Sequence, residues 1–146
     1  MITAFATRTA RLERLELATR HLGEAVWIDL DCPTEAEEDA VEAALGIDIP
    51  TREDMQEIEV SSRIYREADS LFLTAQVVAS HELRETEIGP VTFVVLPKRL
   101  VTVHYHHPGS MKFFADWAAR HDTPLASGLS VLLALMEAVV DRLADI

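Results

Sequence analysis

The stretch PVTFVVLPKRLVTVHY, residues 90–105, consists of two apolar runs separated by a short polar break. The runs 90–96 and 100–105 are rich in β-branched and aromatic residues, which predicts two β-strands. Because only Pro97, Lys98 and Arg99 separate them, the strands are expected to be antiparallel neighbours. Both runs are almost continuously apolar, so we place them at the centre of a sheet that is covered on both faces.

Shorter strands are predicted on both sides of this pair. Two of them open the chain and are close enough to form a hairpin, and the others follow turn or loop residues. These strands are expected at Ile2–Thr7, Leu12–Leu17, Ala25–Leu30, Ser62–Glu67 and Ser70–Ser80.

Helices are predicted between and after the strands. Thr34 and Glu37 have the spacing of a capping box, which starts a helix that ends at Gly46. A second, short helix starts at Pro50-Thr51 and is expected to reach about Glu59. Two longer helices cover Ser110–His121 and Ser127 to the end. Together these elements predict an α/β fold, a mixed sheet between helical layers, in one domain of residues 1–146.

Composition excludes several functional classes. The chain has 146 residues with 49% apolar residues, enough for one domain with a hydrophobic core. Its 25 acidic and 13 basic residues give a charge of -12, which repels nucleic acid and anionic membrane surfaces and attracts cations. Cys32 is the single cysteine, so no intramolecular disulfide can form and a reducing compartment is expected. Residues 1–11 show no signal-peptide pattern.

The last predicted helix has no sequence signal that ends it. Residues 143–146 contain no Gly, Pro or Asn, and their charged residue, Asp145, opposes the helix dipole. We therefore expect this helix to continue past Ile146 as part of a longer protein. The apolar stretch 125–136 is much shorter than the roughly 20 residues of a membrane span, so we expect it to be a buried helix.

Acidic side chains are concentrated in residues 35–59, where ten carboxylates accompany one arginine. A solvated helix face explains most of them. Glu53, Asp54 and Glu57, however, concentrate negative charge on one helical turn, and Mg²⁺ is usually bound by one or two carboxylates and several waters. Thr51 and Asp54 could equally be a capping pair. Both interpretations stay open from the residues alone.

The C-terminal helix carries a second candidate acid. Glu137 and Asp141 are four residues apart and share a helical face, where like charges repel by a few tenths of a kcal/mol. A solvated helix edge explains the pair, and a cation between this helix and another acidic surface is the alternative.

Histidines suggest a different metal. His104 and His106 are expected on one side of a strand, and imidazole suits zinc, but no fuller ligand pattern accompanies them. Cys32 is expected to be a buried or half-buried thiol, and Trp27 and Trp117 to be core aromatics. The sequence contains no Gly-rich phosphate loop and no nucleophile elbow, so we expect that the chain is not an enzyme.

An ordered series of segments resembles the cytosolic N-terminal domain of CorA-type magnesium transporters. The similarity extends over nearly the whole chain. Its segments are 27–30 (WIDL), 33–34 (PT), 46–54 (GIDIPTRED), 57–65 (EIEVSSRIY), 90–93 (PVTF), 100–103 (LVTV) and 133–141 (LALMEAVVD).

The resemblance implies a homopentamer with a funnel-shaped cytosolic part of α/β/α layers. A stalk helix, two transmembrane helices and a Gly-Met-Asn motif would follow, and none of these is in this sequence. Such a domain lies at the cytoplasmic face of the inner membrane. The resemblance also implies that the domain senses Mg²⁺ between neighbouring subunits and that this Mg²⁺ keeps the pore closed. The resemblance implies Mg²⁺ as the transported ion, with Co²⁺ as a second candidate.

The family's sensing acids fall on Glu53, Asp54 and Glu137 of this sequence, and their partner aspartate on the stalk lies beyond Ile146. The resemblance therefore implies weak regulatory Mg²⁺ binding by this chain alone, which we expect to be a monomer or weak oligomer. Two alternatives remain, the cytosolic domain of a zinc-transporting relative and a free-standing metal-binding interaction module.

Overall fold

A mixed β-sheet of seven strands organises the computed structural model, which describes residues 1–16, 20–57, 59, 63–81 and 84–144. The strand order is β2-β1-β3-β7-β6-β5-β4. β3 and β7 are parallel and the other neighbouring pairs are antiparallel, which confirms the predicted mixed sheet. The strands are β1 (Ile2–Arg8), β2 (Arg11–Arg14), β3 (Trp27–Asp31), β4 (Ile64–Glu67), β5 (Ser70–His81), β6 (Arg84–Val95) and β7 (Leu100–His104).

The pair β6 and β7 lies inside the sheet, as predicted. The two strands are antiparallel in a register that joins Val95 to Leu100 and Val91 to His104, and every residue of β7 is buried. β6 begins at Arg84, six residues before the predicted start. Residues 86–88 are exposed, and Ile88 is the single apolar residue among them, so the sequence shows no apolar run that would predict a strand here. Backbone pairing with β5 forms this part of β6.

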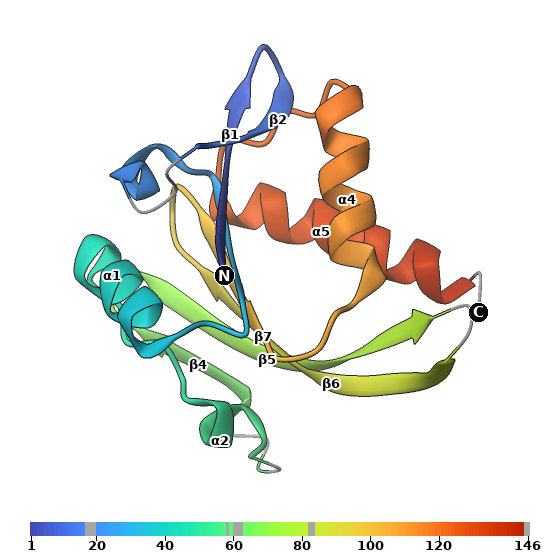
Figure 1. The fold of residues 1–146 in the computed structure, drawn as a ribbon. Coiled ribbons are helices and arrows are strands. Elements are labelled where there is room, and N and C mark those ends of the chain that lie inside the picture. The colour runs from blue at the N-terminus through green and yellow to red at the C-terminus, as the bar shows by residue number, and fades with distance from the viewer. Residues whose placement is uncertain (17–19, 58, 60–62, 82–83, 145–146) are drawn as a thin grey trace.

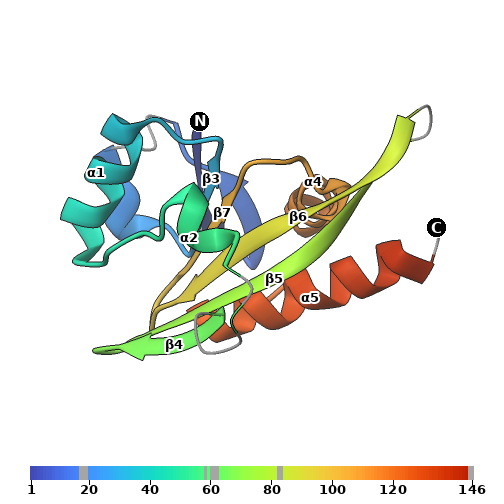
Figure 2. The same ribbon diagram turned by 90° about the horizontal axis from the view of Figure 1, so that it is seen from below.

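Helices cover both faces of this sheet (Figures 1 and 2). On one face, Val41 and Met55 belong to a core with Val94 and Val103 of the sheet. On the other face, Phe114 and the last helix form a second core with strand residues including Trp27 and Phe93. The first layer contains α1 (Glu35–Leu45) and α2 (Arg52–Met55), and the second contains α4 (Gly109–Arg120) and α5 (Gly128–Ala144). A 3₁₀ helix, η2 (Leu22–Glu24), precedes β3.

Local signals fix the ends of α1. The Thr34 side chain accepts from Glu37 N at 3.2 Å, and Glu37 Oε1 accepts from Thr34 N at 3.0 Å, which confirms the capping box. Gly46 ends the helix with φ 66°, a conformation that glycine adopts without a Cβ penalty. These residues set α1 directly after β3.

The short helix α2 ends at Met55, four residues before the predicted Glu59. Met55 is the buried residue of α2, so the sheet anchors only this turn. A longer helix would place Glu57 and Glu59 near its C-terminus, where acids oppose the dipole.

The second helical layer differs from the prediction at Trp117. This side chain is 38% exposed and stacks on His121 with ring centroids 4.6 Å apart, so Trp117 is not a core aromatic, whereas Trp27 is. In the described part of the chain, the helices are too short or too polar to cross a bilayer.

Candidate functional site

Glu53 and Asp54 lie in the first turn of α2, and both are exposed. Asp54 completes a capping box, because its Oδ2 accepts from Thr51 N at 3.0 Å and its own N donates to Thr51 Oγ1 at 3.1 Å. The prediction that Thr51 and Asp54 form a capping pair is therefore confirmed. The capping box also holds the Asp54 carboxylate in a fixed position at the helix N-terminus.

Glu137 lies on α5 and is exposed, as is Asp141 one turn later. α5 and α2 cover opposite faces of the sheet (Figure 2). The structure therefore does not bring Glu137 together with Glu53 or Asp54 inside one copy of the chain.

The predicted histidine pair is not a metal site in this structure. β7 ends at His104, and His106 turns toward β5 and β6, where its Nε2 lies 2.8 Å from Val77 O. Its ring passes so close to Gly89 that a Cβ there would lie 2.7 Å from His106 Nδ1. Both histidines are buried, and the strand does not present them side by side as ligands.

His104 belongs instead to a buried hydrogen-bond network. Its Nδ1 lies 2.6 Å from His106 O and its Nε2 lies 2.9 Å from Asp29 Oδ1. Both neighbours are acceptors, so both ring nitrogens serve best as donors, which is the charged imidazolium. Burial alone would lower the pKa of His104, but the Asp29 carboxylate, together with the His106 carbonyl and the Asp31 charge, outweighs it and the net pKa is raised. Thr102 Oγ1 donates to Asp29 Oδ1 at 2.6 Å and accepts from Trp27 Nε1 at 3.0 Å.

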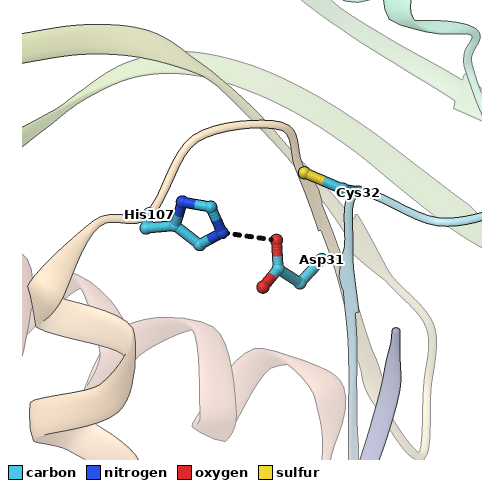
Figure 3. Close-up of side chains that lie close together, drawn as sticks. All are labelled: Asp31, Cys32 and His107. Atoms are coloured by element: carbon cyan, nitrogen blue, oxygen red, sulfur yellow. Dashed lines mark ion pairs between the residues drawn. The ribbon is translucent and has the colours of Figure 1, made fainter.

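A second cluster, which was not predicted from the sequence, contains Asp31, Cys32 and His107. One potential ligand atom of each residue lies within 4.8 Å of the other two (Figure 3). His107 Nε2 is 3.1 Å from Asp31 Oδ1. Asp31 and His107 follow two runs that pair in parallel, and the carboxyl ends of parallel neighbours meet at one edge, but no local sequence pattern indicates this pairing.

Cys32 was predicted to be a buried or half-buried thiol, but the residue is exposed. Its backbone has φ 43°, an uncommon conformation for a residue with a Cβ. Cys32 N donates to His104 O at 2.9 Å, which joins the segment after β3 to the end of β7. Partial burial and the neighbouring Asp31 raise the pKa of the thiol.

A cavity of about 650 Å³ adjoins this cluster, between the sheet and α4. Asp31, His104 and His107 line it together with apolar side chains and with Arg14 and Lys112. The cavity is large enough for a small molecule, and its charges are of both signs.

The similarity to known proteins extends over the whole chain. The model of the family "CorA-like Mg2+ transporter protein" matches residues 23–146. The magnesium transport protein CorA of Pasteurella multocida is 29% identical over 147 residues, covering 100% of this chain and 46% of that protein. CorA of Escherichia coli is 28% identical over 146 residues, covering 99% and 46%. The chain therefore spans about half the length of the curated relatives it matches.

Solved structures share the fold. The soluble domain of CorA from Methanocaldococcus jannaschii superposes with a TM-score of 0.70 at 13% identity, covering 97% of this chain and 56% of that one. The ZntB cytoplasmic domain from Vibrio parahaemolyticus gives 0.64 at 13% identity, covering 98% and 60%. At this identity the likeness concerns architecture, whereas the family model matches the sequence itself. The chain belongs to the family of CorA-like Mg²⁺ transporter proteins.

Proposed function

We propose that this chain is the cytosolic regulatory domain of a Mg²⁺ transporter, with Co²⁺ as the second candidate ion. The match of the family model over residues 23–146 carries the proposal. In the full-length protein the chain continues into a stalk helix and two transmembrane helices and assembles as a homopentamer. The domain then lies at the cytoplasmic face of the inner membrane.

Glu53, Asp54 and Glu137 are the proposed sensor residues. Their carboxylates are exposed, and hard cations prefer such oxygen ligands. Because α2 and α5 lie on opposite faces of the sheet, one ion cannot be shared by Asp54 and Glu137 of the same copy. This arrangement supports ions that bridge neighbouring subunits. The capping bonds of Asp54 add preorganisation, since they fix the carboxylate before an ion arrives.

The proposed regulation is electrostatic. Each copy carries a charge of -12, so neighbouring domains repel when no cation lies between them. Mg²⁺ at the interface neutralises part of this charge and holds the domains in the closed arrangement. A fall in internal Mg²⁺ releases the ions, and repulsion moves the domains apart.

The surface of α5 supports a contact with another part of the assembly. Four large apolar side chains on this helix are more than 45% exposed: Leu129, Leu133, Val140 and Leu143. Exposed apolar residues in such number on one helix favour a binding surface. Without that partner we expect the 146-residue chain to be a monomer or weak oligomer that binds Mg²⁺ weakly.

Limited proteolysis of the full-length transporter across a Mg²⁺ titration tests the proposal. Mg²⁺ should protect the wild type, and the double variant Asp54→Ala, Glu137→Ala should need a much higher concentration. Thr51→Ala is the matched control, because it removes the other half of the capping box and keeps every carboxylate. A wild type without protection, or a double variant that responds like the wild type, contradicts the sensor assignment.

A further inference from the structure

We propose that Asp31, Cys32 and His107 form a binding site for a thiolate-preferring divalent transition metal, of which Zn²⁺ is the representative. The site lies where β3 and β7 end side by side. It is separate from the proposed Mg²⁺ acids on α2 and α5. Neither proposal depends on the other.

The spacing of the three side chains is close to that of a metal site. With ligand bonds of about 2.0–2.3 Å, tetrahedral zinc places its ligand atoms roughly 3.3–3.8 Å apart. His107 Nε2 and Asp31 Oδ1 are already 3.1 Å apart, and the three ligand atoms lie within 4.8 Å of one another. Side-chain movements on the order of 1 Å would complete the geometry. Figure 3 shows the thiol of Cys32 beside the His107–Asp31 pair.

Asp31 Oδ1 gives an independent indication that this cluster can bind a cation. This oxygen is buried and has no hydrogen-bond partner among the described residues. His107 Nε2 is near, but the contact is an ion pair by distance and does not have hydrogen-bond geometry. A buried acceptor left unsatisfied is unfavourable, and a cation between the carboxylate and the imidazole would satisfy it.

The backbone holds the ligands in place before any metal binds. Cys32 N donates to His104 O at 2.9 Å, so the segment that carries Asp31 and Cys32 is tied to the one that leads to His107. Cys32 keeps a left-handed φ of 43°. Such conformations persist where the surrounding structure fixes them and occur often at ligand sites.

The donor set selects the metal class. Cys32 offers sulfur, His107 nitrogen and Asp31 oxygen, which together suit Zn²⁺, whereas Mg²⁺ requires oxygen ligands. Three protein ligands leave one coordination position for water or a second molecule, and Asp31 and His107 also line the adjoining cavity. The Asp31 carboxylate that disfavours the Cys32 thiolate in the metal-free protein becomes a partner of the metal.

Calorimetric titration of the reduced 146-residue chain with Zn²⁺ alone tests the site. We expect saturable binding of one ion per chain in the wild type, and at least a tenfold loss of affinity in Cys32→Ser and in His107→Ala. His121→Ala is the matched control, since His121 is exposed on α4's C-terminal side and stacks on Trp117. Its affinity should equal that of the wild type.

Cobalt gives a second readout. Co²⁺ bound at the site should show a thiolate-to-metal charge-transfer absorption that disappears in Cys32→Ser. Thermal unfolding in a chelator checks that the variants are folded, which is expected because Cys32 and His107 are exposed.

Three outcomes would overturn the proposal: no saturable Zn²⁺ binding by the wild type, unchanged affinity in Cys32→Ser and His107→Ala, or loss of binding only in Glu53→Gln and Asp54→Ala. The first two leave the Mg²⁺ proposal untouched, because the proteolysis of the full-length transporter does not involve these ligands.

Discussion

Asp54 and Glu137 lie on opposite faces of the same sheet, Asp54 beside the core that contains Met55 and Glu137 on the helix that contains Leu135. The two carboxylates of one copy therefore cannot share a single ion with each other. Asp54 also has a second task within its copy, since it caps α2. Any experiment on Asp54 must separate these two roles.

Replacing Thr51 or Asp54 by Ala should destabilise the chain by similar amounts. Each change removes half of the capping box of α2, and loss of an N-terminal cap costs about 1 kcal/mol. Urea unfolding of the 146-residue chain measures this difference. Thr51→Ala should leave the Mg²⁺ response of the full-length protein intact, whereas Asp54→Ala should weaken it. Equal Mg²⁺ responses would show that Asp54 serves only as a cap.

Gly128→Ala should destabilise the fold although alanine favours helices. A Cβ at this position would collide with the backbone carbonyls of Leu96 and Arg99, against which α5 begins. Overpacking of this kind typically costs about 1–3 kcal/mol. Gly23→Ala is the control, because a Cβ there meets no atom within 4 Å. Thermal unfolding should show a lower Tm for Gly128→Ala alone, and equal Tm values would refute the close contact.

Tyr105 should titrate far above an ordinary tyrosine. Burial and the hydrogen bond from its hydroxyl to Glu38 Oε1, 3.0 Å long, raise its pKa to about 12. The folded chain thus keeps a proton that the unfolded chain loses near pH 10. This contribution to stability is complete below about pH 10 and is lost as the pH rises through about 12.

Ultraviolet titration of phenolate absorbance measures this value, and Tyr65→Phe removes the signal of the other tyrosine. Glu38→Gln should lower the pKa of Tyr105, because it removes the negative charge beside the hydroxyl. Arg52 lies over the Tyr105 ring, 5.0 Å from its centroid, so Tyr105, which follows β7, contacts both α1 and α2. An unchanged pKa in Glu38→Gln would contradict the hydrogen bond.

The central features of the fold could be predicted from local sequence. The apolar runs 90–96 and 100–105 predicted two inner strands, and the capping pair Thr34 and Glu37 predicted the start of α1. The predicted start of β6 was wrong because the first residues of this strand are fixed by backbone pairing with β5 and are not buried. The predicted end of α2 was wrong because α2 is a single turn, anchored to the core by Met55. The family match confirmed the resemblance and places the chain in a family of transporter proteins, not in a family of enzymes.

The candidate sites were harder to predict because their members are far apart in sequence. His104 and His106 were expected to share a strand face, but β7 ends between them and His106 turns under Gly89. The cluster of Cys32 and His107 exists only because β3 and β7 are parallel neighbours, which no local pattern specifies. Glu53, Asp54 and Glu137 remain predictions, since their proposed partners lie in other subunits.

Ion flux through the full-length transporter in liposomes, measured while Mg²⁺ on the cytosolic side is varied, tests the regulatory role most directly. The wild type should close as Mg²⁺ rises. The triple variant Glu53→Gln, Asp54→Ala, Glu137→Gln should stay open at concentrations that close both the wild type and Thr51→Ala. Closure of the triple variant at the wild-type concentration would contradict the account.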